Sequence, residues 1–286
     1  MRLGLLVSGG LGEDILKKIS EIHEIVFVFT DKHSLEIREY VNQHSIPNFI
    51  GNPRNSRTAE FVKDKSIDVL VSVNYLYIID SQLIGLPIKL AFNIHGSLLP
   101  KYRGRTPHVW AIINNESETG ITAHVINEGC DTGPILDQML VRIEPNDTGN
   151  MVLGKYKNCY FPLVKDVLAK IESGSYELTQ QDDSLATYFG KRTPEDGQIN
   201  WNWQKERIRN WVRAQAFPYP GAFSYIQGQK IIIDELVFVE RGFHSEQPNG
   251  QILSVDPILV KTPNGVVQLK QVRSFDRTIH LGDILN

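Results

Sequence analysis

The chain has 286 residues, of which 41% are hydrophobic and 22% are charged, and its formal net charge is -3. These values are typical of globular proteins and exclude intrinsic disorder and fibrous architectures. With 30 basic residues against 33 acidic ones, the protein has no global field to attract nucleic acid or an anionic membrane, so we expect neither as a partner.

Alternating apolar runs and amphipathic stretches predict an α/β fold for the first part of the chain. Helices are expected at residues 12–22 and 34–44. Strands are expected at residues 2–8, 24–30, 48–51, 68–73 and 90–94. This alternation indicates a mostly parallel twisted sheet with helices on both faces, a Rossmann-like domain.

The pattern changes towards the C-terminus. Residues 106–114 are predicted to be helical, residues 120–125 and 140–143 to be strands, and residues 148–173 to be one long helix, bent at Pro162. A short helix is then expected at residues 205–214, followed by strands at 222–226, 230–240, 250–255, 258–262 and 266–272. We therefore expect a catalytic domain over residues 1–180, a polar linker over 181–200, and a small, mainly antiparallel β domain over 201–286.

Cysteine usage indicates a reduced compartment. Only Cys130 and Cys159 occur, and neither stands in a Cys-x-x-Cys pair, so the sequence predicts no disulfide framework and no metal site. The apolar start of the chain is too short for a signal peptide, and no run of 18 apolar residues occurs. We expect a cytoplasmic protein.

Asn93 and His95 follow the strand predicted at residues 90–94. Ligands of open α/β sheets bind at the carboxyl ends of strands, and residues two apart on a strand project to the same side. A side-chain amide can stabilise an oxyanion and an imidazole can relay a proton, which suits acyl transfer. Alone, such residues are more often turn or capping residues.

The surrounding block contains N-x-H, S-L-L-P, Y-R-G, T-G-x-T-x-H and D-x-G-x-I in order between residues 92 and 136. This block resembles the formyltransferases that use 10-formyltetrahydrofolate. The resemblance implies a catalytic trio of Asn93, His95 and Asp131. Asn93 would stabilise the oxyanion formed when an amine attacks the formyl carbon, and His95 would act as base or electrostatic partner. Asp131 would orient His95 and could move a proton toward the departing folate nitrogen.

The resemblance also implies where the folate binds. The pterin ring would lie between the loop after residues 68–73 and the segment leading to Asp131. The provisional folate contacts, mostly through backbone groups, are Tyr75, Leu76, Ile126, Asn127, Glu128 and Gly129. For Tyr75, aromatic core packing is the competing interpretation.

The acceptor amine is the second substrate. Residues 197–286 contain 10 Lys and Arg against 8 Asp and Glu, which disfavours tRNA because phosphate contacts dominate nucleic-acid affinity. The amino-acid sequence of the motifs more closely resembles that of the family members that act on nucleotide-linked amino sugars. These members use dTDP or UDP as carrier and serve surface polysaccharide (lipopolysaccharide) biosynthesis. Candidate acceptor contacts, which would stack on the base or bind the diphosphate, are Tyr102, Arg103, Gly104, Lys191, Arg192, Phe217 and Tyr219.

Three alternatives stay open: a methionyl-tRNA formyltransferase, a formyltetrahydrofolate hydrolase, and a catalytically silent folate-binding protein. The second domain favours a second substrate over hydrolysis, and the complete trio disfavours a silent protein. Strand edges of the C-terminal domain suggest a homodimer.

Overall fold

The computed structural model describes residues 1–273, 275 and 278–286. The chain divides into two compact units and passes between them several times. The first unit comprises Met1–Gly104, Gly120–Val141 and Lys155–Tyr188, and the second comprises Arg105–Thr119, Arg142–Gly154 and Phe189–Asn286. Segments 105–119 and 142–154 belong to the second unit together with the C-terminal part of the chain, and the domain boundaries expected from the sequence stay a prediction.

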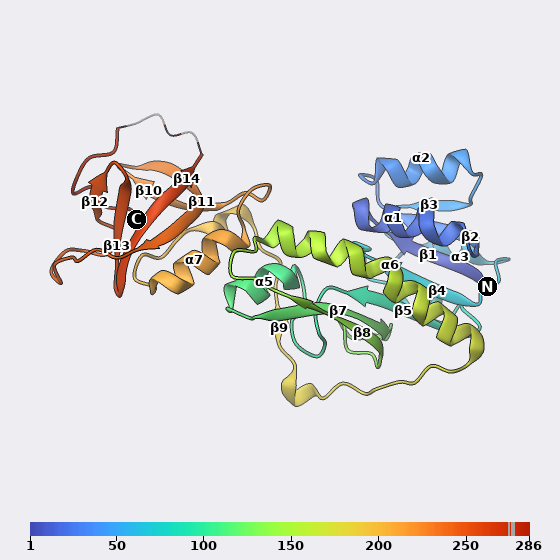
Figure 1. Cartoon of the computed structure of the whole chain (residues 1–286). Helices are drawn as coiled ribbons and strands as arrows, with labels where there is room; N and C mark the ends of the chain where they lie inside the picture. The colour runs from blue at the N-terminus through green and yellow to red at the C-terminus, as the bar shows by residue number, and fades with distance from the viewer. Residues whose placement is uncertain (274, 276–277) are drawn as a thin grey trace. The chain divides into compact units, whose positions relative to one another are not determined.

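The first unit is built around a seven-stranded sheet with the order β3-β2-β1-β4-β5-β7-β8 (Figure 1). Its strands are β1 (Arg2–Val7), β2 (Glu24–Thr30), β3 (Asn48–Ile50), β4 (Val69–Val73), β5 (Leu90–His95), β7 (Glu118–Val125) and β8 (Ile135–Arg142). The first five strands in this order pair in parallel, whereas β7 pairs antiparallel with β5. The predicted mostly parallel sheet is confirmed, and β8 begins five residues earlier than the strand expected at residue 140.

Helices cover both faces of this sheet. They are α1 (Gly9–Ser20), α2 (Leu35–Gln43), α3 (Ser56–Val62), α4 (Ser81–Ile84) and α6 (Gly149–Ser173). Crossovers between parallel strands are right-handed. The helices α1 and α2 follow the chain from β1 towards β3, whereas α3 and α4 follow it back across the sheet towards β5. The two pairs of helices therefore lie on opposite faces of the sheet. The Nζ atom of Lys18 lies 5.5 Å from the ring centre of Phe161, so α6 packs beside α1. The helix α6 continues through Pro162.

The core beneath α3 and α4 is rich in aromatic side chains. Phe27 and Phe29 of β2 pack edge to face with their ring centres 5.6 Å apart. A Cβ atom on Gly4 of β1 would lie 2.5 Å from the ring of Phe27, so the neighbouring strand needs glycine there. The buried members of this core cluster are Leu6, Phe27, Phe29, Phe49, Val62, Ile67, Leu70, Leu83 and Ala91.

The second unit contains α5 (Pro107–Ile113), α7 (Lys205–Ala214) and an antiparallel sheet with the order β10-β11-β14-β13-β12. Its strands are β10 (Ala222–Ile226), β11 (Gln229–Val239), β12 (Ile252–Val255), β13 (Ile258–Thr262) and β14 (Gly265–Val272). The C-terminal residues pair with both sheet edges, since Asn286 exchanges backbone hydrogen bonds with Tyr225, and the N–H of Ile252 donates to Asp283. This unit confirms the predicted small antiparallel β domain.

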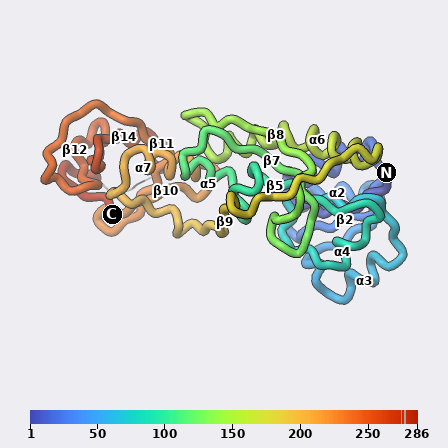
Figure 2. The backbone as a smooth tube through the Cα atoms, turned by 90° about the horizontal axis from the view of Figure 1, so that it is seen from below, coloured from blue at the N-terminus to red at the C-terminus, as the bar shows by residue number. Residues whose placement is uncertain are grey.

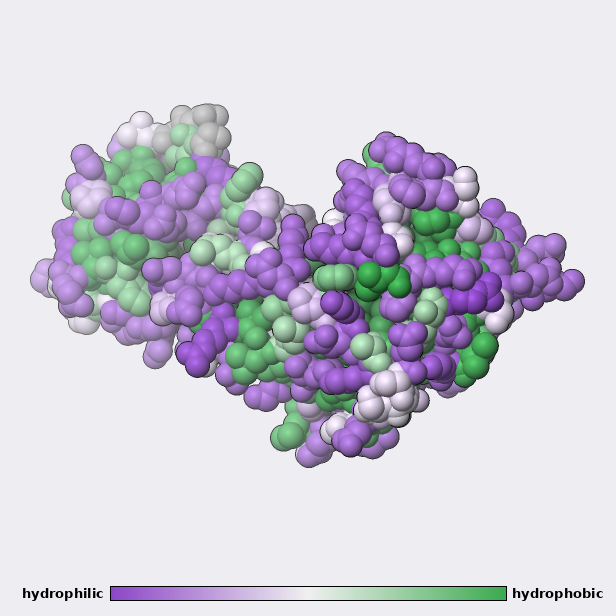
Figure 3. All heavy atoms as spheres, turned by 45° about the vertical axis from the view of Figure 1, so that its right-hand side comes forward, coloured by the Kyte–Doolittle hydropathy of each residue, from purple (hydrophilic) through white to green (hydrophobic). Residues whose placement is uncertain are grey.

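Hydrophilic side chains dominate the face seen in Figure 3. Within the described part of the chain, no helix has the length and apolar character needed to cross a membrane.

Candidate active site

The structure brings Asn93, His95 and Asp131 together at the end of β5. Asn93 and His95 lie on β5, where the antiparallel register places Asn93 opposite His124 of β7. Asp131 lies in the loop between β7 and β8, with its carboxylate 3.5 Å from His95 Nδ1 and 3.5 Å from His124 Nε2. The site therefore contains a fourth polar side chain, His124, whose role could not be predicted from the sequence.

The contacts of His95 define its tautomer. Its ring is buried, and Nε2 lies 2.8 Å from the carbonyl oxygen of Tyr102, so Nε2 carries a proton and donates it to this carbonyl. In the neutral ring, Nδ1 is then an unprotonated base that faces the Asp131 carboxylate. Burial lowers the pKa of His95 below its usual value, and the charge of Asp131 offsets this only in part. His95 is thus a neutral imidazole, and the Asp131 carboxylate beside it would stabilise its protonated form.

His124 orients the amide of Asn93. The Nδ1 atom of His124 lies 3.0 Å from the carbonyl oxygen of Val125 and donates to it, which leaves Nε2 as an acceptor. Asn93 Nδ2 lies 3.2 Å from this Nε2 and donates one of its hydrogens. Within the described residues the second N–H of Asn93 has no protein partner, so it is available to donate to a ligand oxygen.

Asp131 is held in a tight loop. Its φ angle is 57°, in the left-handed region that non-glycine residues rarely adopt, and its Oδ2 accepts a 3.0 Å hydrogen bond from the N–H of Gly104. A Cβ atom on Gly133 would overlap the carbonyl of Val125, so the glycine of D-x-G lets the loop approach β7. Burial alone would raise the pKa of Asp131, but attraction to the His124 and His95 rings in their protonated forms, together with the hydrogen bond from Gly104, holds this pKa well below its ordinary value. Asp131 is therefore a carboxylate at neutral pH.

Arg103 does not present a free cation to a substrate, contrary to its predicted role. Only 1% of the residue is exposed, and its guanidinium donates to Gln181, Asp183 and the hydroxyl of Tyr188. Its neighbours Tyr102 and Gly104 instead serve the trio directly, through the Tyr102 carbonyl and the Gly104 N–H. The loop thus shapes the site from inside the protein.

The two segments predicted to contact folate lie against the same part of the protein. Tyr75 and Ile126 both pack on the core cluster under α3 and α4, which supports the competing core-packing interpretation for Tyr75. Leu76 is exposed, as is Glu128. The side chain of Asn127 accepts hydrogen bonds from Gly129 and Thr132 and so shapes the turn before Asp131.

The remaining candidate residues belong to the second unit, where they have different environments. Arg192 is half-buried, with its guanidinium 4.3 Å from the ring centre of Trp211 and 5.0 Å from that of Trp110, so it mainly ties this unit together. The hydroxyl of Tyr219 lies 3.0 Å from His108 Nε2. Phe217 and Lys191 have exposed side chains.

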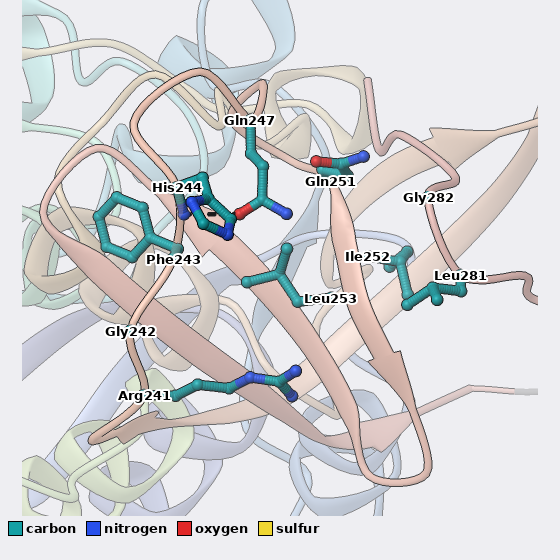
Figure 4. Close-up of a pocket in the computed structure, with 10 residues that line it drawn as sticks. All are labelled: Arg241, Gly242, Phe243, His244, Gln247, Gln251, Ile252, Leu253, Leu281 and Gly282. Atoms are coloured by element: carbon teal, nitrogen blue, oxygen red, sulfur yellow. Dashed lines mark hydrogen bonds between the residues drawn. The ribbon is translucent and has the colours of Figure 1, made fainter.

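The second unit also contains a cavity of about 770 Å³. Ten residues from the β11–β12 connection, β12 and the C-terminal tail line this cavity, among them Arg241, Phe243 and Leu281 (Figure 4). None of the residues predicted from the sequence lines it. In the described part of the chain, no group of three or more His, Cys, Asp or Glu residues is arranged to hold a metal ion.

Comparison with known proteins gives a family assignment. Residues 8–159 match the model of the formyl transferase domain, and residues 191–286 match that of the formyl transferase C-terminal domain. The first match alone covers more than half of the chain and contains Asn93, His95, His124 and Asp131.

Several solved structures have a similar fold. One is WlaRD, described as a sugar 3N-formyl transferase in the presence of dTDP and 5-N-formyl-THF, with a TM-score of 0.69 and 20% identity over 96% of this chain and 99% of WlaRD. Another is the N-formyltransferase from Helicobacter canadensis in complex with folinic acid and dTDP-3-aminofucose, with a TM-score of 0.68 and 21% identity over 94% of this chain and 98% of the other. The methionyl-tRNA formyltransferase from Clostridium thermocellum has a TM-score of 0.59 and 18% identity over 84% of this chain and 94% of the other.

The two domain matches occur in the order expected from the sequence motifs, and the first contains all four polar side chains that meet at the end of β5. The chain therefore belongs to the formyl transferase family.

Proposed function

We propose that the protein transfers a formyl group from 10-formyltetrahydrofolate to the amino group of a dTDP- or UDP-linked amino sugar. The main support for this proposal is the arrangement of Asn93, His95 and Asp131. The Asp131 carboxylate lies 3.5 Å from the neutral imidazole of His95 and 3.5 Å from His124, and His124 orients the amide of Asn93. Two solved structures of similar fold, described with a folate and with dTDP or a dTDP-sugar, support a nucleotide-linked amino sugar as the acceptor.

The proposed reaction uses His95 as the base. As the acceptor nitrogen attacks the formyl carbon, Nδ1 of His95 takes the proton that the nitrogen loses. The Nε2–H of His95 remains hydrogen-bonded to the Tyr102 carbonyl, so the ring keeps its orientation while its charge changes. Asn93, oriented by His124, donates its second N–H to the formyl oxygen as negative charge develops there.

Asp131 supports the protonated state of His95. Because the pKa of Asp131 is held low, its carboxylate stays ionised and stabilises the imidazolium across the 3.5 Å contact. When the bond between the formyl carbon and the folate nitrogen breaks, His95 returns its proton to the departing nitrogen. The proton thus passes from the acceptor amine to the folate through His95, and Asp131 acts by its charge alone.

On the folate side, we propose that the pterin ring binds near the segment from Ile126 to Gly129 and the loop containing Tyr75 and Leu76. The common packing of Tyr75 and Ile126 on one core cluster supports this placement. Of the second-unit residues predicted to contact the acceptor, Phe217 and Lys191 have exposed side chains, and their contact with the nucleotide base and the diphosphate stays a prediction.

An acceptor panel tests the proposed function. The protein is incubated with 10-formyltetrahydrofolate and dTDP- or UDP-linked amino sugars, and with charged initiator tRNA in a parallel reaction. We expect the mass of one formyl group to be added to a nucleotide sugar. Transfer to tRNA alone, with a steep loss of activity at high salt, would replace this proposal with tRNA formylation.

The tautomers in the site give a prediction that needs no substrate. In ¹H–¹⁵N spectra of the histidine rings at pH 7.5, we expect His95 as the Nε2–H tautomer and His124 as the Nδ1–H tautomer. Because burial lowers the pKa of His95, its ring should gain a proton at a lower pH than an ordinary histidine does. His95→Gln and His124→Gln assign the signals, and a His95 ring that is already protonated at neutral pH would contradict its role as a base.

We place this reaction in the cytoplasm, as a supply of formylated amino sugars for surface polysaccharide (lipopolysaccharide) precursors. The homodimer expected from the sequence also remains a proposal, and light scattering of the purified protein tests it.

A further inference from the structure

The segment between α6 and the second unit is closely connected to the active site. We call residues 179–188 the strap; in Figure 2 they belong to the yellow stretch of tube that leads to β9 (Tyr188–Phe189). At one end, Thr179 exchanges two backbone hydrogen bonds with Ile135 of β8. At the other end, the carbonyl of Thr187 accepts from the N–H of Arg103, at 2.8 Å, where β6 (Arg103–Gly104) meets β9. The strap therefore spans both loops that hold the trio's partners.

Gln181 is the residue of the strap that reaches the Asp131 loop. Its side-chain nitrogen donates to the carbonyl oxygens of Asp131, at 2.9 Å, and Gly133, at 2.7 Å. Its side-chain oxygen accepts from Nε and Nη2 of the buried Arg103, at 3.1 and 2.7 Å. Both hydrogens and both lone pairs of the amide are used. If the amide were flipped, its NH2 group would face the Arg103 cation and its oxygen would face the two carbonyl oxygens, which is unfavourable. The orientation of Gln181 is thus fixed by its four contacts.

The Asp131 backbone needs such support. Its φ angle of 57° is sparsely populated for a residue with a side chain, and a conformation of this kind persists only where the surroundings over-determine it. The carboxylate must also meet Gly104 N–H and the two imidazoles at the same time. Holding the Asp131 carbonyl from the opposite side restricts the direction in which the carboxylate points.

The strap reaches the other partner of His95 as well. The hydroxyl oxygen of Thr187 accepts from the N–H of Tyr102 at 2.8 Å, and the carbonyl of the same Tyr102 accepts from His95 Nε2. Tyr102 has a φ angle of 60°, so its backbone conformation is also one that needs external support. The strap thus contacts the residues on both sides of the His95 ring, Tyr102 at Nε2 and Asp131 at Nδ1.

We propose that Gln181 is a positioning residue for Asp131 and that, through the buried Arg103, it locks the Tyr102–Gly104 loop and the Asp131 loop into one catalytic geometry. Arg103 is accordingly the anchor of this arrangement rather than a phosphate ligand. The inference rests on the proposed function, because it assigns Gln181 a role in the same reaction.

Gln181→Ala tests the proposal, with Gln180→Ala as the matched control because Gln180 is the exposed neighbouring residue of the same type. We expect Gln181→Ala to lower kcat by about 10- to 100-fold, since misplacement of a catalytic group by about 1 Å has effects of this order. The KM for the folate should stay within about twofold, and Gln180→Ala should match the wild type. A wild-type kcat in Gln181→Ala would overturn the proposal.

Gln181→Glu distinguishes the role of the side-chain oxygen, which contacts Arg103, from that of the side-chain nitrogen, which contacts Asp131 and Gly133. It also provides a second test if the alanine variant fails to fold. Glutamate retains an acceptor for Arg103 but places oxygens against the carbonyls of Asp131 and Gly133. We expect it to remain folded and to lose kcat as Gln181→Ala does. Full activity in this variant would show that only the contact with Arg103 matters and would overturn the assignment to Asp131.

The ring spectrum of His95, recorded without substrate, keeps this test independent of the acceptor. The titratable side chains facing the ring are Asp131 and His124, so displacement of Asp131 removes the favourable charge and should move the His95 titration to lower pH. If the wild type transfers no formyl group to a nucleotide sugar, the proposed function fails while this spectrum still decides the role of Gln181. An unchanged His95 signal in both Gln181 variants would overturn the inference even where kcat falls.

Discussion

His95→Gln is expected to lower kcat by about 10²–10⁴-fold while the protein stays folded, because the variant has no base to accept the proton of the acceptor amine. Glutamine retains an N–H that can donate to the Tyr102 carbonyl, so the loop should keep its position. Single-turnover measurement of formyl transfer separates this loss from a defect in binding or product release.

The matched control for this variant is His33→Gln, because the His33 side chain is exposed and lies outside the site. It should have the activity of the wild type. A rate for His95→Gln within a few-fold of the wild type, with the control unaffected, would exclude His95 as the base.

Asp131→Asn is expected to lower kcat on the order of 10²-fold, because it removes the charge that stabilises protonated His95 at nearly constant size. The contact between Asp131 and His95 also determines the direction in which this substitution shifts the pKa of His95. The anion raises the pKa of His95 against the larger effect of burial, so removing it should lower this pKa further. Rates measured over pH, together with the His95 ring titration, check both expectations.

Asp166→Asn serves as the control, since Asp166 is exposed on α6. Its kinetics and its His95 titration should match those of the wild type. If Asp131→Asn left the His95 titration where it is in the wild type, the carboxylate would have no electrostatic role, and the mechanism proposed for the trio would be wrong.

Much of the architecture could be predicted from the sequence because its signals are local. The apolar strands β1, β2, β4 and β5 are buried runs, and the amphipathic α6 and α7 have apolar residues at helical spacing. The short helices α3 and α4 were not predicted, since seven and four residues give too little periodicity to detect. The N-x-H pair and the D-x-G loop could be placed in one site because motif order and fold topology agree.

The environments of the polar residues were harder to predict, because they depend on contacts between distant parts of the chain. The sequence predicts that Arg103 contacts the acceptor, yet its partners lie about 80 residues further on, in the strap. His124 stands in the T-G-x-T-x-H motif, but its role is visible only from the β5–β7 register that places it opposite Asn93. Gln181 has no local pattern at all, and a polar segment with glycines at its edge resembles an ordinary linker.

The measurement that tests the central claim most directly follows the formyl carbon itself. The protein is given 10-formyltetrahydrofolate with ¹³C in the formyl group, together with the nucleotide-linked amino sugar that gains mass in the acceptor panel, and the label is followed by ¹³C NMR. We predict that the signal moves to an N-formyl amide on the sugar, with no matching formation of formate, and that His95→Gln blocks this transfer. Label that accumulates as formate, with or without the amino sugar, would contradict the proposal and identify the protein as a hydrolase.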